Sequence, residues 1–293
     1  GLPPGPPGLN SREAMTDESR SARLRPRRDA AGVALFGVPL DHNSSFLRGA
    51  RRAPRAIRAH LLSGSMNWTA ECGVDLERHE GWSDWGDVDC RGDAGDMSRI
   101  EAFAAEAWRG RRLLALGGDH SITAPVLRGR QRGGPPLTIV HFDAHPDLYP
   151  EFEGNRDSHA CPFHRVMEEG LAGRLVQLGV RTVNSIQAEA ARQFGVEIVP
   201  PDAVADWPGV DGPGPIYVSF DMDALDPAYA PGVSHHEPGG LTVREVLRVL
   251  GRLRGPVVGA DIVELNPDRD PDGRTAAVAA KLAKELLARL LQT

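Results

Sequence analysis

The sequence contains little cysteine, and this limits the classes of protein to which it can belong. Three cysteines occur in 293 residues, at Cys72, Cys90 and Cys161, and no Cys-x-x-Cys spacing is present. An odd number of widely separated cysteines indicates neither a disulfide framework nor a zinc knuckle. The sequence therefore favours a reducing compartment, and we expect a cytoplasmic protein.

Long apolar runs and an excess of positive charge are also missing from the sequence. No apolar stretch approaches the roughly 20 residues that cross a bilayer, so no membrane partner is expected. The formal net charge of -6 provides no basic surface for nucleic acid. Because 41% of the 293 residues are apolar, the chain can instead bury one large core.

Residues 1–30 differ in composition from the rest of the chain. They open with the Pro- and Gly-rich stretch Gly1–Gly8 and continue through the basic stretch Arg20–Arg28, without apolar periodicity. Three acidic residues, Glu13, Asp17 and Glu18, count against a transit peptide. We expect residues 1–30 to form a disordered tail and residues 31–293 to form a single domain.

From Gly32 onward, short apolar runs alternate with amphipathic stretches, a pattern typical of a parallel sheet covered by helices. The expected strands are almost continuously apolar, which indicates burial on both faces. They are Val33–Val38, Leu113–Leu116, Leu137–Phe142, Leu175–Leu178, Ile216–Phe220 and Val257–Val263. The expected helices are Pro54–Leu62, Arg99–Arg109, Thr242–Leu253 and Arg274–Leu291.

Carboxylates and histidines gather where four of these apolar runs end. The clusters are Gly117–Ser121, Asp143–Asp147, Ser219–Pro227 and Glu264, with His159 between the second and third. In open α/β sheets, sites form beyond the carboxyl ends of the strands. Buried carboxylates that point to one side need cations, because an isolated ionised carboxylate is strongly disfavoured in a low-dielectric interior. The clusters therefore predict a two-metal hydrolytic site.

Several acidic residues and histidines have simpler interpretations. A lone Asp-x-Asp usually forms a turn or a helix cap, and we interpret Asp119 and Asp226 as turn residues or supports of the metal ligands. His141 lies inside a buried run and is expected to be a hydrogen-bonded core histidine. Four further histidines are expected to be structural or solvated, namely His42, His60, His79 and His164.

From about Gly32 to the C-terminus the chain resembles the ureohydrolases, the arginase and agmatinase superfamily. Three motifs carry the resemblance in the order that the family has: Gly-Gly-Asp-His-Ser at 117–121, Asp-Ala-His-x-Asp at 143–147 and Ser-Phe-Asp-x-Asp-x-x-Asp-Pro at 219–227. The resemblance implies a three-layer α/β/α domain with a mainly parallel eight-stranded sheet, assembled into homo-trimers or hexamers. Four further segments look most like plant-type arginases and bacterial agmatinase-like proteins, namely Asn43–Gly49, Glu153–Asn155, Ser158–Ala160 and Pro231–His235.

The resemblance also implies a set of metal ligands. One ion would be held by His120, Asp143, Asp147 and Asp221, and the other by Asp143, His145, Asp221 and Asp223. Such an oxygen-rich shell with one imidazole per ion suits Mn²⁺, with Ni²⁺ possible, better than zinc. Two ions about 3.5–4 Å apart lower the pKa of a shared water toward about 7. Asp147 would accept a hydrogen bond from this nucleophile.

A guanidinium group is the substrate that the resemblance implies. The carboxylate of Glu264 can accept paired guanidinium N–H groups, and His159 is similar to the proton shuttle of the family, which protonates the departing amine. Urea and an amine are the expected products. A zinc-dependent deacetylase of the same fold is disfavoured, because it needs no residues equivalent to His120 and Asp147. A metal-loaded regulatory subunit requires His159 or Glu264 to face away from the metals.

The sequence leaves open the remainder of the guanidino substrate, which can be agmatine, arginine, guanidinobutyrate or free guanidine. The segments Tyr149–Asp157 and Ser234–Glu237 are expected to line the mouth of the site. An acidic Asp157, where plant-type enzymes tend to have an aromatic residue, gives a slight preference for the amine tail of agmatine. The expected substrate-binding residues, besides Glu264, are Asn155, Asp157, Ser158 and His235.

Overall fold

The computed structural model of the chain describes residues 24, 28, 32–130 and 134–292. Most of the expected tail at residues 1–30 lies outside the described residues. Two positions of this segment are described, and both contact the domain. Leu24 is buried in the apolar core, and the Arg28 guanidinium lies 4.6 Å from the centre of the Phe103 ring and 3.0 Å from Glu106.

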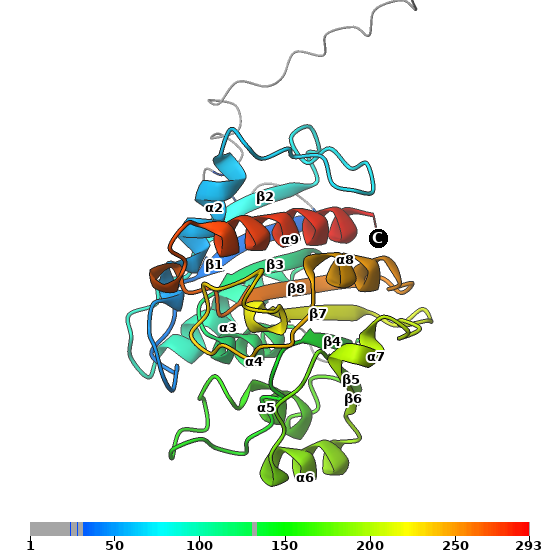
Figure 1. Cartoon of the computed structure of the whole chain (residues 1–293). Coiled ribbons are helices and arrows are strands. Elements are labelled where there is room, and N and C mark those ends of the chain that lie inside the picture. The colour runs from blue at the N-terminus through cyan, green and yellow to red at the C-terminus, as the bar shows by residue number, and fades with distance from the viewer. Residues whose placement is uncertain (1–23, 25–27, 29–31, 131–133, 293) are drawn as a thin grey trace, which may run out of the picture.

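A single sheet of eight strands forms the middle layer of the molecule, and every strand pairing in it is parallel (Figure 1). The strand order is β2-β1-β3-β8-β7-β4-β5-β6. The strands are β1 (Val33–Val38), β2 (Trp82–Asp87), β3 (Arg112–Gly117), β4 (Thr138–Phe142), β5 (Arg174–Leu178), β6 (Glu197–Val199), β7 (Ile216–Asp221) and β8 (Val257–Val263).

Helices cover both faces of the sheet and complete the three layers. The α-helices are α2 (Ala53–Leu62), α3 (Asp96–Ala107), α4 (Thr123–Arg128), α5 (Pro162–Glu168), α6 (Ser185–Phe194), α7 (Pro201–Val204), α8 (Val243–Gly251) and α9 (Arg274–Leu291). Short 3₁₀ helices are η1 (Ala50–Arg52), η2 (His120–Ile122), η3 (Met222–Ala224) and η4 (Pro267–Arg269). Within the described residues, no helix is both long enough and apolar enough to cross a membrane.

Two apolar cores, one on each side of the sheet, hold the layers together. Along β1, Val33 and Leu35 pack into the core beneath α2, α8 and α9, whereas Phe36 and Val38 pack into the core beneath α3, α4 and α5. This alternation follows from the two-residue period of a strand. Because both faces are covered, the strands are apolar on both faces, as parallel sheets require.

The expected fold is confirmed, and all six expected strands are present. The two additional strands, β2 and β6, are the edges of the sheet. Their sequences Trp-Ser-Asp-Trp-Gly-Asp and Glu-Ile-Val lack a continuous apolar run. In β2 the buried Asp84 is compensated by Arg58 of α2, at 2.6 Å. An ion pair with a helix that is separated from β2 in the sequence therefore stabilises this strand, which hydrophobic patterning does not indicate.

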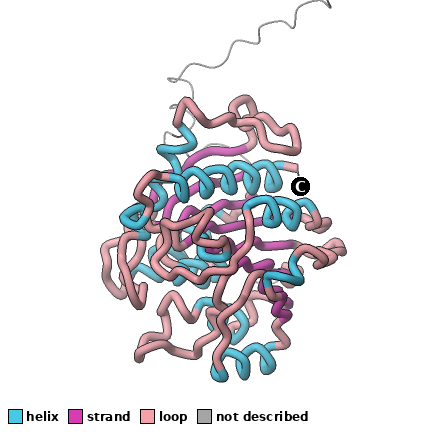
Figure 2. Tube along the Cα trace, viewed as in Figure 1, coloured by secondary structure: helices cyan, strands magenta, loops and turns pink. Residues whose placement is uncertain are grey.

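The carboxyl ends of all the strands meet at one edge of the sheet, since the strands are parallel. Long loops gather at this edge, on the left of the view in Figure 2. They include the loops that follow β1, β4, β5, β7 and β8, and the short turn Gly118–Asp119 follows β3 at the same edge. This edge holds the clusters of acidic residues and histidines.

Candidate metal centre and active site

Four adjacent strands bring together residues that are far apart in the sequence. β3, β8, β7 and β4 are consecutive in the sheet. His120 follows β3, Asp143 follows β4, Asp221 ends β7 and Glu264 follows β8. All four side chains are buried. The topology of the sheet therefore assembles the site.

The imidazole of His120 faces three carboxylates. Its Nδ1 lies 3.1 Å from Oδ2 of Asp147 and 3.2 Å from Oδ2 of both Asp143 and Asp221. This nitrogen is buried and has no hydrogen-bond partner in the part of the chain that the structure describes. One nitrogen and three carboxylate oxygens thus converge on one point without a hydrogen bond joining them.

The hydrogen bonds on the other side of the His120 ring show that its Nδ1 carries a lone pair. Ser219 Oγ donates its one hydrogen to Asp261 Oδ1 at 2.6 Å, so it accepts a hydrogen from Nε2 of His120 at 3.0 Å. Nδ1 of a neutral His120 is then unprotonated. The other oxygen of Asp261 accepts hydrogen bonds from Tyr217 at 2.7 Å and Thr123 at 2.9 Å. Such a network is typical of the residues that orient a metal-binding histidine.

A second histidine forms an equivalent group with two carboxylates. Nδ1 of His145 lies 3.1 Å from Asp223 Oδ2 and 3.4 Å from Asp143 Oδ1. Asp143 therefore faces His120 with one oxygen and His145 with the other, so it could serve both groups of ligands. The remaining oxygen of Asp223 accepts the backbone N–H of Ala144 at 3.0 Å, which fixes the direction of its carboxylate.

The charges of this cluster are not balanced by cationic side chains. The ion pairs that the structure describes for Asp143, Asp147, Asp221 and Asp223 are all with histidines. Burial, together with the carboxylates of Asp223 and Asp143, raises the pKa of Asp221 well above its usual value. Crowded buried anions of this kind are stabilised by metal cations. The residues therefore fit a pair of hard divalent ions that prefer oxygen and imidazole ligands.

His141 links the metal-ligand candidate Asp143 to the buried side chain of Gln177. The side-chain amide of Gln177 donates to Nδ1 of His141 at 3.0 Å and to the carbonyl of Pro146 at 2.6 Å. Nε2 of His141 therefore donates to Asp143 at 2.8 Å. With both nitrogens engaged, His141 is the hydrogen-bonded core histidine that the sequence predicts.

The two expected supporting aspartates also take the predicted form. Asp119 is buried and accepts the backbone N–H groups of Ser121 and Asn43, both at 3.1 Å. Asp226 accepts the backbone N–H groups of Ala228 at 2.9 Å and Gly239 at 2.7 Å. Both aspartates therefore fix loops rather than the metal centre.

His159 and Glu264 lie in direct contact beside the cluster. Nδ1 of His159 is 2.9 Å from Oε1 of Glu264, which also accepts the backbone N–H of His120 at 2.8 Å. Arg274, a basic residue that follows Glu264 in the sequence, pairs with Asp272. Glu264 adopts a φ of 64° and Asp147 a φ of 50°. Positive φ values are uncommon for residues other than glycine and often mark functional sites.

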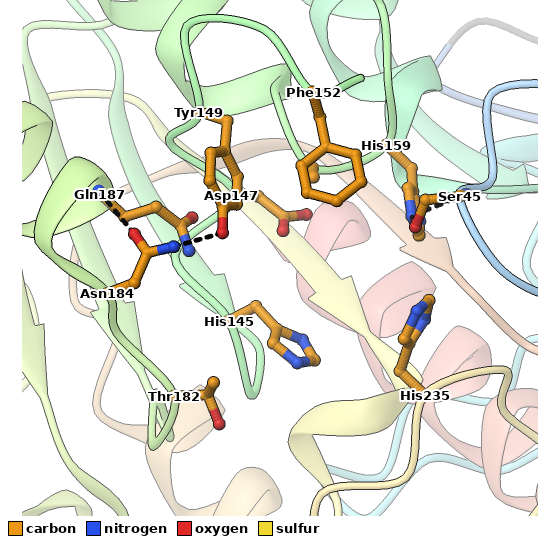
Figure 3. Close-up of a pocket in the computed structure, with 11 residues that line it drawn as sticks. Ser45, His145, Asp147, Tyr149, Phe152, His159, Thr182, Asn184, Gln187 and His235 are labelled. Atoms are coloured by element: carbon orange, nitrogen blue, oxygen red, sulfur yellow. Dashed lines mark hydrogen bonds between the residues drawn. The ribbon is translucent and has the colours of Figure 1, made fainter.

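A cavity of about 180 Å³ opens next to His145, Asp147 and His159. Figure 3 shows Tyr149, Asn184 and Gln187 on one side of it and His159, Ser45 and His235 on the other. Asn184 donates to the hydroxyl of Tyr149. The wall formed by Tyr149, Thr182, Asn184 and Gln187, called the polar wall below, is uncharged.

Some expected substrate-binding residues lie elsewhere. Asn155 and Asp157 line a neighbouring cavity with His42 and Asp93, and Asn155 donates to Asn43 at 3.0 Å. The Ser158 side chain is buried, and neither Ser158 nor Asp157 lines the cavity beside the metal ligands. Of the expected set, His235 does line it. The slight preference for agmatine depended on Asp157 facing the mouth, and because Asp157 lines the neighbouring cavity its charge does not favour an amine tail.

Sequence reasoning also missed residues that line the cavity. Thr182, Asn184 and Gln187 follow β5, the neighbour of β4, and therefore reach the same edge of the sheet. Ser45 follows β1 and contacts His159. Position after a parallel strand is the signal that could have found them, but in a single sequence a neutral side chain does not indicate a chemical role.

A buried histidine and carboxylate cluster at the carboxyl edge of a parallel α/β sheet defines a metal-dependent hydrolase. A model of the arginase family matches residues 31–288. Arginase 1, mitochondrial, of Arabidopsis thaliana is 46% identical over 281 residues, covering 89% of this chain and 81% of the relative. Guanidinopropionase of Pseudomonas aeruginosa is 38% identical, covering 90% of this chain and 88% of the relative. The solved structure of arginase from Medicago truncatula superimposes with a TM-score of 0.83 at 42% identity, covering 89% of this chain and 88% of that one.

The chain therefore belongs to the arginase family. It is a hydrolase of guanidino C–N bonds that acts on small guanidino compounds. Members of this family bind a dinuclear metal centre, and the histidine and aspartate clusters described above fit such a centre.

Proposed function

We propose that the protein hydrolyses L-arginine to urea and ornithine. The observation that carries this proposal is the uncharged polar wall, which lines the same cavity as the expected metal ligands His145 and Asp147. Hydroxyl and amide groups both donate and accept hydrogen bonds, so the wall suits a zwitterionic α-amino acid head. The similarity to plant arginases supports the same substrate.

Other guanidino compounds fit this wall less well. Agmatine ends in an ammonium group, which favours a carboxylate partner, and guanidinopropionate ends in a carboxylate, which favours a cationic partner. The polar wall contains neither kind of residue. The opposite charges of an α-amino acid head compensate each other, whereas the single terminal charge of either compound would be buried without a partner, which is costly. Both compounds should therefore be weaker substrates.

The roles of the site residues follow from their positions. His120, Asp143, Asp147, Asp221, His145 and Asp223 would hold two Mn²⁺ ions, with Ni²⁺ as the alternative. When bound, the ions supply an activated water as nucleophile, and Asp147 orients it by accepting a hydrogen bond. Assembly into homo-trimers or hexamers stays a prediction.

Two residues beside the metal ligands act on the guanidinium and on the departing amine. Glu264 binds the guanidinium through the carboxylate oxygen that His159 and the backbone of His120 leave free. His159 then gives the proton of Nε2 to the departing amine, because its Nδ1 faces Glu264.

Urea release tests the proposal. Metal-free protein is reloaded with Mn²⁺, Ni²⁺ or Zn²⁺ and assayed with arginine, agmatine, guanidinopropionate, guanidinobutyrate and guanidine. We expect the highest kcat/KM with arginine, by about 10-fold or more over agmatine, since an unpaired buried polar group costs roughly 1–3 kcal/mol. Asp157→Asn is the matched control and should leave the arginine-to-agmatine ratio unchanged. A preference for agmatine rejects arginine as the substrate, and no urea from any compound rejects the proposed function.

A further inference from the structure

We infer that Ser45 is a positioning residue for His159, holding the ring nitrogen that gains and loses the proton. This inference rests on the proposed function, in which His159 protonates the departing amine. Ser45 is a loop residue that lines the cavity but is not among the expected metal ligands or substrate-binding residues.

The contacts of the His159 ring divide cleanly between its two nitrogens. Nδ1 is engaged by the Glu264 carboxylate at 2.9 Å. Among the described residues, the hydrogen-bond partner of Nε2 is Ser45, with the hydroxyl at 2.8 Å and the backbone N–H at 3.1 Å. Since a carboxylate only accepts hydrogen bonds, Nδ1 keeps its hydrogen in both charge states of the ring. Nε2 is therefore the nitrogen that exchanges the proton, and Ser45 is its partner.

A serine hydroxyl suits both charge states of a proton shuttle. When the ring is neutral, Nε2 is an acceptor and receives the N–H or the O–H of Ser45. When the ring is protonated, Nε2 is a donor, and only the hydroxyl oxygen of Ser45 can receive its hydrogen. A residue without a hydroxyl at this position would keep a partner for the neutral ring through its backbone N–H. It would leave the protonated ring without one on this side, so Ser45 stabilises the state that acts as the acid.

The loop that carries Ser45 is fixed to the same segment that carries a metal ligand. Asn43 donates through its backbone N–H to Asp119 and through its side chain to Ser121, both at 3.1 Å. The carbonyl of Asn43 accepts the backbone N–H of His159 at 3.2 Å. These contacts fix the Ser45 loop relative to His159. The 2.8 Å contact between the Ser45 hydroxyl and Nε2 is therefore made by a loop that is held in place.

A double-mutant cycle tests the inference in the Mn²⁺-loaded full chain, with urea release as the readout. Ser45→Ala should lower kcat roughly 10- to 100-fold with little change in KM, the usual worth of a hydrogen bond to a charged group. Ser45→Thr keeps the hydroxyl and should restore most of the activity. Ser44→Ala is the matched control, because the Ser44 hydroxyl faces Asp119 at 3.4 Å rather than His159. It should change kcat by less than about 2-fold.

The decisive comparison adds Ser45→Ala to His159→Asn. His159→Asn alone should lower kcat by roughly 10²–10⁴, and Ser45→Ala should then have almost no further effect, because residues that act as a unit are not additive. Additive losses would mean that Ser45 acts on the substrate, and a Ser45→Ala protein with normal kcat would overturn the inference outright. So would a Ser45→Thr protein as impaired as Ser45→Ala.

A spectroscopic measurement separates failure of this inference from failure of the proposed function. In Zn²⁺-loaded protein with ¹⁵N-labelled histidine, Nε2 of His159 should shift in Ser45→Ala and return toward the wild-type position in Ser45→Thr, whatever substrate is used. If no guanidino compound yields urea but this shift is present, the proposed function fails and the contact stands. An Nε2 signal that is unchanged by Ser45→Ala rejects the contact itself.

Discussion

Nδ1 of His159 lies 2.9 Å from Oε1 of Glu264, the same oxygen that accepts the backbone N–H of His120 at 2.8 Å. One carboxylate oxygen therefore fixes His159, the proposed proton shuttle, and the start of the 3₁₀ helix that carries His120, a proposed metal ligand. Two donors occupy the lone pairs of this oxygen. A guanidinium can then bind to the other oxygen, or it must compete with His159. In the proposed mechanism, Glu264 would thus couple guanidinium binding to the proton transfer by His159.

Glu264→Gln should lower both kcat/KM and the pH at which activity is lost on the alkaline side. Burial opposes protonation of His159, yet the carboxylates of Glu264, Asp119 and Asp147, with Glu264 contributing most, together outweigh it and raise the pKa of His159 to about 9. Removing the negative charge lowers this pKa, so the protonated acid is lost at a lower pH. The loss of a charged partner for the guanidinium should cost about 2–5 kcal/mol, or roughly 30- to several thousand-fold in kcat/KM.

The pH profile of kcat, metal content and melting temperature are measured together for this variant. The metals should stay bound, since Glu264 lies outside their shell. Asp272→Asn is a matched control, because it removes an exposed carboxylate that pairs with Arg274. A Glu264→Gln protein with near-normal turnover and an unmoved alkaline limb contradicts both roles of Glu264. An unfolded variant would indicate that the contact with His120 is chiefly structural.

Removal of metal should abolish activity and lower the melting temperature. Four clustered carboxylates lose their compensating charge in the metal-free protein, and a ligand that binds only the folded state stabilises it by mass action. Chelation followed by dialysis, then differential scanning calorimetry with and without added Mn²⁺, checks the effect. Two metal equivalents per chain should be recovered from the active protein. A fully active protein that contains one ion per chain would contradict the dinuclear assignment.

Where the sequence predicts the fold well, hydrophobic patterning and burial coincide. The bounds of β1, β8 and α9 agree with the expected ranges Val33–Val38, Val257–Val263 and Arg274–Leu291. Two of these ranges are nearly continuous apolar runs, and the third is a long amphipathic helix. Short helices such as α7, with four residues, and the polar edge strand β2 depend on tertiary partners, which a single sequence does not display.

The site shows the same division between local and tertiary information. Residues that follow central strands, such as His120 and Asp143, can be placed from the sequence because parallel strands end at one edge. The direction of a loop side chain cannot be obtained in this way. Asp157 and Phe152 belong to one loop, yet Phe152 lines the cavity beside the metal ligands and Asp157 lines the neighbouring one. The contact between Ser45 and His159, which joins residues 114 positions apart, is equally hidden.

Asp261→Asn should weaken metal binding although Asp261 is not a ligand. Asp261 is fully buried, and Ser219 links it to the Nε2–H of His120. Its negative charge makes His120 a better donor to the metal, and loss of such a partner usually lowers metal affinity by roughly 10–100-fold. Competition with a chromogenic chelator measures the affinity without any assay of activity.

Two further variants separate this effect from a loss of stability. Ser219→Ala cuts the same link while keeping the Asp261 charge, so it should weaken metal binding in the same direction. Asp226→Asn is the control, because Asp226 stabilises a loop through the backbone N–H groups of Ala228 and Gly239. It should lower the melting temperature without changing metal affinity. If Asp261→Asn and Ser219→Ala both bind metal as tightly as the wild-type protein, the network sets only the packing of the core, and the orientation of His120 has another cause.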